Sequence, residues 1–459
     1  MLLILYNRIF SLMEMTVNIR RGLDLRLKGG VEAGPQVKSV APGLVAVCPD
    51  DFPGFTPKLA VKEGQTIEEG APLLFDKINP DTMLVSPVAG TVKAVVRGDR
   101  RKILRVEVET TPEKSAPATT SVGSDAEALR LALRRSGLWA MMRQLPYDIV
   151  PEPAVTPRDI FVTAIDSAPL AVDLPRSVEG KSAEIEAGLK ALATLTSGKV
   201  YVGMRPDAAI PVPDPAVKVV VKGSHPAGNA GVLAANIKPV NKGETIWKLD
   251  IVTVARMGHL ILKGFVDWST LVAVTGSEVK TPCLVQTVAG AQIKPLIEGN
   301  VNNDGHHHRI IAGNVLTGTA TGIDGFLHYP YRQITVIPEG DDVNEFMGWA
   351  SMSPEKMSVS RSFLSRFLPG KKFAPDARLL GGRRAMIMSG EYDKVFPMDV
   401  MPEPLLKAIM SRDIDRMEQL GIYEVSPEDF ALCEYVDPSK TEIQKTVREG
   451  LDYLRKELE

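Results

Sequence analysis

The amino-acid sequence predicts a multidomain α/β protein, and three observations lead to this prediction. The chain has 459 residues, which is enough for about three domains of ordinary size. Its content of 44% hydrophobic and 24% charged residues is typical of globular domains with several apolar cores. Segments patterned as helices and as strands follow one another along the chain, as they do where helices pack on sheets.

The charge and the cysteines argue against several classes of protein. The formal net charge is −2, so the chain has no basic field, and nucleic acid is not an expected partner. Cys48, Cys283 and Cys433 are far apart and odd in number, which indicates a reducing compartment rather than a disulfide framework. No apolar run approaches the roughly 18 residues that a membrane helix needs. We therefore expect any membrane association to come through a partner.

Residues 1–36 are predicted to hold an N-terminal extension and the first strands. Residues 1–14 (MLLILYNRIFSLME) are apolar but interrupted by Arg8 and Glu14, and they lack the basic start and cleavage site of a signal peptide. Met15 is a second plausible start. Residues 1–14 are interpreted either as a non-essential extension or as a small surface anchor.

Residues 37–110 are predicted to form a β-rich domain. Short apolar segments alternate with turns at Gly64, Gly70 and Gly90, and the pattern V-x-E-G-Q…G…P-V-A-G-T-V resembles the biotinyl/lipoyl-type barrel-sandwich domain. In biotin carriers the modified lysine stands at the place that Asn79 occupies here, and asparagine cannot form the amide. Lys77 is two places away and lacks flanking methionines. We expect it to be an unmodified loop lysine, with a biotin or lipoate carrier as the alternative.

Residues 111–124 are rich in Pro, Ser, Thr and Ala, and they are predicted to be a linker before a Rossmann-like domain at 125–253. The elements expected in that domain are a helix at 128–138, a strand at 160–165, a helix at 183–195, and buried strands at 200–202 and 217–221. The loop after Gly137 is where such a domain would hold a phosphate on glycine N–H groups. Trp139, Met141 and Met142 occupy positions that would have to be small. We therefore expect a nucleotide-binding scaffold without its nucleotide.

From residue 254 to residue 328 the sequence changes to short segments with many glycines, and we predict a β-grasp insert of the SLBB type. The segments are ARMGHLILKGF, STLVAVTGS, CLVQTVAGAQI and RIIAGNVLTGTATG. His306, His307 and His308 lie in a turn without partners at ligand spacing, so no metal site is predicted there. His225, in the loop at 222–228, is expected to make a local hydrogen bond rather than to act as a catalytic base.

Residues 329–380 are predicted to return to the core, and residues 381–459 to form a helical domain. The expected elements are a strand at 332–338 and helices at 361–367, 402–409, 411–421 and 441–457. The helices and prolines resemble a ferredoxin-like module, but the ligand spacing C-x2-C-x2-C-x3-C-P contains only one thiol. The ligand positions are Pro427, Phe430, Cys433 and Asp437 before Pro438, and Met386, Ser389, Tyr392 and Phe396 before Pro397. No iron–sulfur centre is predicted, and Cys433 is expected to be a small buried hydrophobic residue.

Nine motifs in order along the chain carry a resemblance to a known family. They are IRRGLDL at Ile19, SGLW at Ser136, IFVTAID at Ile160, HPAG at His225, RIIAGNVLTG at Arg309, FMGWA at Phe346, SVSRSFL at Ser358, GEYDKVFPMD at Gly390 and ALCEYVDPSK at Ala431. Over nearly its whole length after Met15, the chain resembles the A subunit of the sodium-translocating NADH:quinone reductase. It resembles the C subunit of the Rnf electron-transport complex more distantly. The family typically has cysteine at the position of Asp437, so the chain departs from it there.

The resemblance implies an accessory subunit that binds no cofactor and has no catalytic residue of its own. The complex that it implies oxidises NADH, passes electrons through flavins and iron–sulfur centres, reduces quinone and pumps sodium outward. The chain would be peripheral, on the cytoplasmic side of the bacterial inner membrane, among the B to F subunits and chiefly on the membrane-embedded B subunit. The alternative, an Rnf-type NADH–flavin electron-transfer protein, is disfavoured by the glycine-poor loop after Gly137.

The quinone end of that reaction suggests one candidate site. A quinone head is flat and apolar with two carbonyl acceptors, so its site needs apolar walls and one or two donors. The loop after Gly137 offers Leu138, Trp139, Met141 and Met142 as walls, and Arg143 and Gln144 as donors. Two interpretations stay open. These residues contact quinone or the B subunit, or Trp139 and the methionines only fill a vacated cleft as core.

Overall fold

The computed structural model describes residues 15–32, 34, 37–111, 117, 119, 120, 122, 123, 125–344, 353–357, 359 and 363–458. The segment 1–14 and the FMGWA motif at 346–350 lie outside these residues, as do parts of the predicted linker and of the predicted helix at 361–367.

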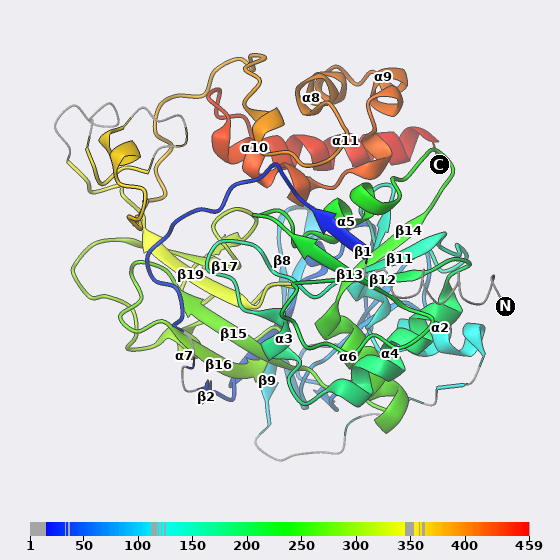
Figure 1. Cartoon of the computed structure of the whole chain (residues 1–459). Coiled ribbons are helices and arrows are strands. Elements are labelled where there is room, and N and C mark those ends of the chain that lie inside the picture. The colour runs from blue at the N-terminus through cyan, green and yellow to red at the C-terminus, as the bar shows by residue number, and fades with distance from the viewer. Residues whose placement is uncertain are drawn as a thin grey trace.

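A six-stranded sheet forms the centre of the molecule (Figure 1). Its order is β1 (Met15–Asn18), β13 (Val217–Lys222), β12 (Val200–Met204), β11 (Asp159–Thr163), β14 (Ile246–Asp250) and β10 (Arg143–Leu145). Neighbouring strands are parallel except at the edge, where β10 runs antiparallel to β14. The parallel strands are apolar runs because both faces of the sheet are covered. The predicted strands at 160–165, 200–202 and 217–221 are thereby confirmed with small shifts of their ends.

The two faces of this sheet belong to different cores. Ile160 and Val162 of β11 point to the core that contains the helices α4 and α6, whereas Phe161 between them points to the core shared with the C-terminal helices. Figure 1 shows the same arrangement, with α4 and α6 below the sheet and α5 and the red C-terminal helices above it. The helices of this part are α2 (Ala126–Arg135), α3 (Leu174–Ser177), α4 (Ser182–Leu195), α5 (Ala230–Ile237) and α6 (Ile251–Lys263).

The segment ARMGHLILKGF lies mostly in helix α6, so the sequence-based assignment of this segment to short strands is wrong. Asp250 caps the helix by accepting the N–H of Thr253 at 2.7 Å, and Gly264 ends it with φ 81°. Nine of its first ten residues are buried, because α6 is covered on nearly all sides. An apolar stripe is therefore hard to recognise in its sequence. The predicted domain border at residue 254 falls within this helix.

Two small antiparallel sheets form the domain near the N-terminus. One has the order β3 (Leu44–Val47), β9 (Ile103–Thr110), β8 (Gly90–Arg97) and β5 (Thr66–Ile67). The other has the order β4 (Pro57–Leu59), β6 (Pro72–Asp76) and β7 (Met83–Val85). Short 3-10 turns cover Pro49–Asp51 and Asp99–Arg101. The structure confirms the predicted β-rich domain and its turns at Gly64 and Gly70. Gly90 was predicted to be a turn but is the first residue of β8.

A second six-stranded sheet combines segments that the sequence analysis had separated. Its order is β18 (Thr319–Thr321), β17 (His308–Ala312), β19 (Gln333–Pro338), β15 (Ser269–Thr275), β16 (Cys283–Val288) and β2 (Val37–Ser39). The strand predicted at 332–338 is confirmed, but it lies inside this sheet rather than in a return segment. Strand β2 also belongs here and not to the N-terminal domain. The short helix α7 (Lys294–Ile297) lies between β16 and β17.

The C-terminal part is helical, as predicted, although two elements are shorter than expected. Its helices are α8 (Pro402–Ser411), α9 (Ile414–Gln419), α10 (Ala431–Val436) and α11 (Ile443–Leu458). Arg412, with φ 56°, ends α8 and separates it from α9. Of the helix predicted at 361–367, residues 364–367 form one 3-10 turn. Further 3-10 turns cover Tyr392–Lys394, Ile422–Glu424 and Pro427–Phe430.

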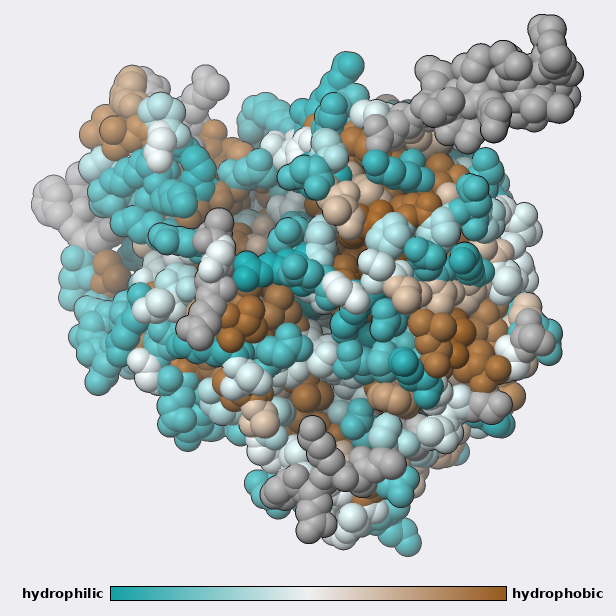
Figure 2. All heavy atoms as spheres, turned by 60° about the horizontal axis from the view of Figure 1, so that its bottom comes forward, coloured by the Kyte–Doolittle hydropathy of each residue, from teal (hydrophilic) through white to brown (hydrophobic). Residues whose placement is uncertain are grey.

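The outer surface is mixed in polarity. The face in Figure 2 is largely hydrophilic, with several separate hydrophobic patches between the polar residues. Within the part of the chain that the structure describes, no helix combines the length and the apolar character needed to cross a membrane.

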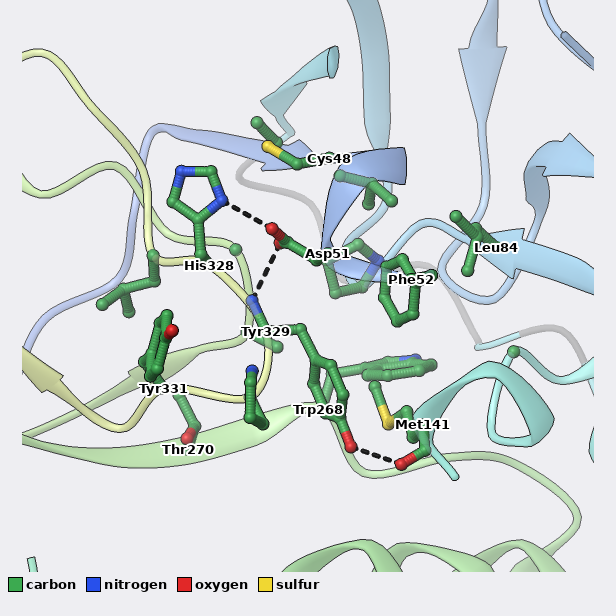
Figure 3. Close-up of a pocket in the computed structure, with 18 of the residues that line it drawn as sticks. Cys48, Asp51, Phe52, Leu84, Met141, Trp268, Thr270, His328, Tyr329 and Tyr331 are labelled. Carbon is green, nitrogen blue, oxygen red and sulfur yellow. Dashed lines mark hydrogen bonds and ion pairs between the residues drawn. The ribbon is translucent and has the colours of Figure 1, made fainter. Parts of the chain in front are cut away.

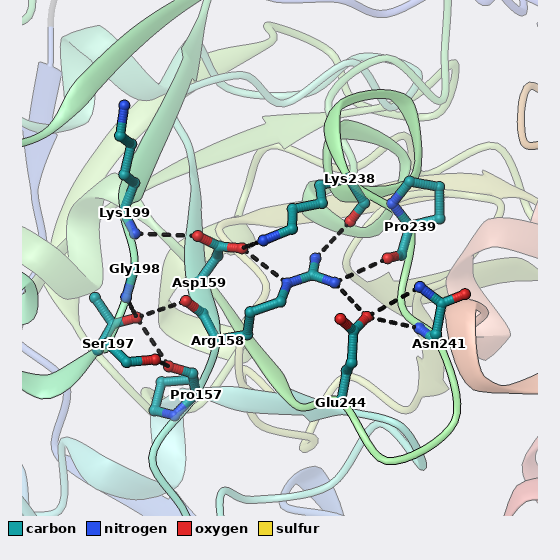
Figure 4. A network of polar contacts seen from close by, with 11 residues as sticks. Pro157, Arg158, Asp159, Ser197, Gly198, Lys199, Lys238, Pro239, Asn241 and Glu244 are labelled. Carbon is teal, nitrogen blue, oxygen red and sulfur yellow. Dashed lines mark hydrogen bonds and ion pairs between the residues drawn. The ribbon is translucent and has the colours of Figure 1, made fainter.

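A network of polar contacts lies at the N-terminal ends of the parallel strands of the central sheet (Figure 4). Asp159, the first residue of β11, accepts the N–H of Lys199 at 3.0 Å and pairs with Arg158 Nε at 2.8 Å and Lys238 Nζ at 3.2 Å. Arg158 also pairs with Glu244 and donates to the carbonyl of Pro239. Because the charges of Arg158, Asp159 and Glu244 are paired within the network, we assign it a structural role.

Candidate functional site

A pocket lies where three parts of the chain meet, namely the N-terminal domain, the central domain and the second sheet (Figure 3). The turn after β3 and the start of β7 form one wall, and the segment after α2 forms another. Helix α6, the start of β15 and residues 327–332 close the remaining sides. The apolar lining residues are Phe52, Leu84, Val85, Met141, Trp268, Leu327, Tyr329 and Tyr331. The polar ones include Cys48, Asp51, Arg256, Thr270, His328 and Arg332.

The carboxylate of Asp51 links the N-terminal domain by hydrogen bonds to the segment before β19. Pro49 starts the 3-10 turn, which brings Cys48 and Asp51 to the same side of the chain. One oxygen of Asp51 lies 2.8 Å from His328 Nδ1, and the other accepts the N–H of Tyr329 at 2.9 Å. This double contact fixes the backbone at 328–329 against the turn.

The rings of Phe52 and Tyr329 stack with centroids 5.3 Å apart and an interplanar angle of 12°. The guanidinium of Arg143 lies over both rings, 5.9 Å from Phe52 and 5.5 Å from Tyr329. Arg143 also donates to the carbonyl of Asp51 at 2.5 Å, and Tyr329 Oη donates to the carbonyl of Met141 at 2.5 Å. The flat aromatic wall is therefore held from behind by hydrogen bonds.

Two arginines bring positive charge to the other side of the pocket. Arg256 from α6 lies over Trp268, 5.6 Å from the ring centroid, and its Nη1 is 3.9 Å from Met141 Sδ. Burial lowers the pKa of Arg256 to about 10, so it stays charged at neutral pH. Arg332 pairs with Asp250, and its buried Nε has no hydrogen-bond partner among the described residues. The pocket thus offers a hydrogen-bond donor beside apolar walls.

The pKa values of several titratable groups in the pocket differ from their ordinary values, and the causes differ from group to group. Burial opposes the charged form of His328, but the hydrogen bonds to Asp51 and Cys48 outweigh it and raise the pKa to about 10. Burial raises the pKa of the Cys48 thiol. Burial also raises the pKa of Tyr329 and that of Tyr331 to about 12. At neutral pH the walls therefore carry a cationic imidazole and neutral phenols.

The six residues that the sequence analysis proposed for a quinone site do not lie together around one cavity in the structure. Met141 lines the pocket, whereas Leu138, Trp139 and Met142 are fully buried and do not line it. Trp139 donates its indole N–H to the carbonyl of Pro151 at 2.7 Å and packs edge-on against Trp247. Arg143 stands behind the aromatic wall. The side chain of Gln144 accepts the N–H of Glu152 at 3.1 Å.

The expected phosphate loop has a different topology from the one the sequence suggested. The segment after Gly137 runs through a 3-10 turn (Trp139–Met141) into the antiparallel strand β10. It does not connect a parallel strand to a helix, which is where anions bind in such sheets. The residues at 139–142 are large because they fill the interior beside α2.

Two residues that the sequence placed in loops differ in their burial. His225 is buried, and its Nδ1 lies 3.1 Å from Ser167 Oγ, so the predicted hydrogen bond exists but reaches a residue 58 positions away rather than a local one. Its buried Nε2 has no hydrogen-bond partner among the described residues. Burial lowers the pKa of His225 to about 4. Lys77 is exposed at the tip between β6 and β7, as predicted.

The three adjacent histidines differ from the prediction in one respect. His306 and His307 are exposed and pair with Asp342 and Asp341. His308 instead starts β17 and points to Glu278 and Asp304, with ligand atoms of the three residues within 4.8 Å of one another. The sequence analysis was therefore wrong that no partner stands at ligand spacing, because Glu278 comes from a distant loop.

Most residues of the pocket were missed by the sequence analysis. The segment FLHYPYR at 326–332 combines aromatic rings with a histidine and an arginine, and CPDDF at 48–52 places a thiol near carboxylates. Such density of rings and polar groups is a signal that could have been used. Arg256 carried no comparable signal, since it lies in a segment that reads as apolar.

The domains of the chain match three family domains. The NqrA N-terminal barrel-sandwich hybrid domain matches residues 17–111, and the NqrA second alpha/beta domain matches residues 124–266. The NQRA C-terminal domain matches residues 271–322.

Curated relatives are similar over nearly their whole length. A protein of Rhodopirellula baltica is 36% identical, with 97% of this chain and 99% of the relative covered. A protein of Serratia proteamaculans is 34% identical, with 96% of this chain and 100% of the relative covered. Both are named as the A subunit of a Na(+)-translocating NADH-quinone reductase. A solved NAD+-reducing NiFe-hydrogenase is 11% identical over 46% of this chain and 47% of that chain, with a TM-score of 0.34, too low to support any conclusion.

Proposed function

The chain belongs to the NqrA family, the A subunits of the Na(+)-translocating NADH-quinone reductase, and we propose that it acts at the quinone-reduction end of such a complex. In this proposal it is a peripheral protein on the cytoplasmic side of the membrane. The B to F subunits are its partners, and the membrane-embedded B subunit holds it chiefly. The complex as a whole transfers electrons from NADH through flavins and iron–sulfur centres to quinone and exports sodium.

The pocket at the junction of the N-terminal domain, the central domain and the second sheet is the observation that carries this proposal. A quinone head requires flat apolar walls and a few donors directed at its carbonyl oxygens. Phe52, Tyr329 and Trp268 supply aromatic walls, and Met141 supplies a thioether. Arg332 Nε is a buried donor without a partner among the described residues, and a bound carbonyl oxygen would satisfy it. Of the residues proposed from sequence, we retain Met141 as a contact and Arg143 as a support of the wall.

We further propose that the chain contributes no redox cofactor of its own. Positions where a ferredoxin-like module would hold cluster ligands are occupied by packed side chains. The rings of Phe396 and Phe430 lie 4.7 Å apart, and Tyr392 and Cys433 are fully buried beside them in one core. Replacing a cluster by rings of this size leaves a close-packed interior. The finer descriptions of the second sheet as an SLBB-type β-grasp unit and of the central sheet as Rossmann-like belong to the same proposal.

A pair of adjacent methionines allows a direct test of the pocket. Met141 lines the pocket, whereas its neighbour Met142 is fully buried elsewhere. Met141→Ala removes one wall, which costs about 1–2 kcal/mol of ligand contact, and so lowers kcat/KM for quinone roughly 5- to 30-fold. NADH oxidation by an artificial electron acceptor should change little. Both activities are measured on the intact complex.

Met142→Ala is the matched control. It opens a cavity in the core and lowers stability by about 2–5 kcal/mol, but the ratio of quinone reduction to artificial-acceptor reduction should stay at the wild-type value. If both variants change this ratio equally, Met141 is merely a core residue and the pocket does not bind quinone. If Met141→Ala releases the chain from the complex, the pocket serves assembly instead.

A further inference from the structure

We propose that Cys48, Asp51 and His328 form a binding site for a borderline divalent metal ion such as Zn²⁺. The sulfur, a carboxylate oxygen and a ring nitrogen of these residues lie within 4.8 Å of one another. All three residues line the pocket described above, so a metal ion held by them would keep one coordination position open to it. The proposal goes beyond quinone chemistry and does not depend on it.

The donor set favours zinc among the common divalent ions. Zinc takes thiolate, imidazole and carboxylate ligands at about 2.0–2.3 Å in tetrahedral geometry. Calcium and magnesium prefer oxygen ligands alone. One thiolate and one carboxylate together balance the two charges of the ion, while imidazole binds in its neutral form. Binding therefore releases two protons to solvent, one from the Cys48 thiol and one from the His328 imidazolium. Three protein ligands with one open position are the arrangement of zinc sites that bind an exchangeable fourth ligand.

The backbone holds two of the ligands on one turn and the third opposite them. Cys48 precedes the 3-10 turn that Pro49 starts and Asp51 is its last residue, and the carbonyl of Cys48 accepts the N–H of Asp51 at 3.2 Å. The second oxygen of Asp51 accepts the N–H of Tyr329 at 2.9 Å, which orients the carboxylate toward His328. Figure 3 shows the three side chains pointing toward one another from the two segments. Such support of a ligand by a second contact is usual at metal sites.

The only rearrangement that binding requires is small. His328 Nδ1 and the Asp51 oxygen are 2.8 Å apart and share a hydrogen bond. Ligands of one tetrahedral zinc ion stand roughly 3.2–3.8 Å apart, as its bond lengths dictate. The ion would therefore replace the hydrogen bond between histidine and aspartate, and the three side chains would close from a spacing of up to 4.8 Å to that of bound ligands.

A second group in the described part of the chain makes the test selective. Glu278, Asp304 and His308 also stand at ligand spacing, but they contain no sulfur. Cobalt(II) replaces zinc in such sites, and a thiolate bound to cobalt gives a charge-transfer band in the near ultraviolet. Cobalt on Glu278, Asp304 and His308 gives no such band. The band therefore reports on Cys48 even when the second group also binds metal.

The experiment titrates the metal-free full-length chain with Co²⁺ and then adds Zn²⁺. We expect a thiolate band that saturates at one equivalent bound through sulfur and disappears when Zn²⁺ is added. Cys48→Ser should abolish the band and weaken Zn²⁺ binding at this site by more than the roughly 10- to 100-fold that loss of a supporting contact costs. His328→Ala should do the same.

Cys283→Ser is the matched control, since Cys283 is equally buried in β16 but belongs to no group of three possible metal ligands among the described residues. It should leave the cobalt band unchanged. The proposal is overturned if the wild-type chain gives no thiolate band, a result that does not depend on any variant folding. It is equally overturned if Cys48→Ser keeps the band or if Cys283→Ser removes it.

Discussion

Replacing Gly258 with alanine is expected to lower the free energy of unfolding by about 2–4 kcal/mol, as overpacking at a rigid contact does. Gly258 lies in α6 where this helix crosses α4, and a Cβ atom added to it would stand 1.7 Å from the carbonyl oxygen of Glu184. Gly188 of α4 has the reciprocal contact, 2.2 Å from the carbonyl oxygen of Val254. The obstacle in each case is backbone, so only separation of the helices can relieve it.

The sign of this effect is opposite to what helix propensity alone predicts. Alanine in place of glycine favours an isolated helix by about 1 kcal/mol. Urea unfolding followed by tryptophan fluorescence measures the net change for Gly258→Ala. Gly382→Ala serves as the control, because nothing lies within 4 Å of a Cβ atom there. Its stability should stay within about 0.5 kcal/mol of wild type. A stabilised Gly258→Ala variant would mean that the two helices do not touch as described.

Lys248→Met is expected to lower the free energy of unfolding by about 3–5 kcal/mol, because it leaves the largely buried Asp148 and the partly exposed Glu428 without their cation. Lys248 of β14 is 5% exposed and lies 2.9 Å from Asp148 and 2.7 Å from Glu428, and it also donates to Ser426 at 3.0 Å. Burial opposes its charge, but Asp148 and Glu428 outweigh that effect and raise its pKa. The lysine thereby joins the central sheet to the turn before α10.

The loss of stability caused by Lys248→Met should depend on pH in a defined direction. Burial opposes ionisation of Asp148, but Lys248 and Arg448 outweigh it and lower the pKa of this carboxyl below its ordinary value. Its stabilising contribution is thus present above the ordinary carboxyl pKa and fades as the pH falls through the lowered value. The deficit of Lys248→Met should therefore be largest at neutral pH and shrink toward acid pH.

The control for Lys248 is Lys242→Met, which removes the same charge from an exposed pair with Glu418. It should change stability by less than about 1 kcal/mol. Adding Asp148→Asn to Lys248→Met should restore part of the loss, because the amide no longer needs a cation. Equal effects of the two lysine variants would show that Lys248 is not held in a buried network.

Much of the fold could be predicted because local pattern and packing agree. Ile160 to Thr163 reads as a buried strand and is one, since both faces of the central sheet are covered. Gly64 and Gly70 mark turns because each adopts a positive φ between short strands. The C-terminal helices were found because their apolar residues recur at helical spacing.

The errors have physical causes as well. Helix α6 was mistaken for strands, since a helix buried on nearly all sides shows no clear stripe. The segments at 48–52 and 326–332 carried a usable signal, but their meeting with Arg256 in one pocket could not be predicted, because these residues come together only when three parts of the chain fold against one another. Trp139 and Met142 carried the composition of a quinone site, yet composition does not reveal which side chains face a cavity and which fill the core.

The first two strands of the chain cannot pair until much later segments of the chain have been synthesised. Met15 of β1 pairs with Val219 of β13, and Val37 of β2 pairs with Leu284 of β16, although a complete small domain lies between each strand and its partner. Both strands leave the ribosome long before their partners exist. Until these partners are made, β1 and β2 remain unpaired strands that are open to wrong contacts. A nascent chain arrested before Val217, where β13 begins, would therefore expose β1 without its partner strand, and we expect such a chain to aggregate more readily than the full-length protein.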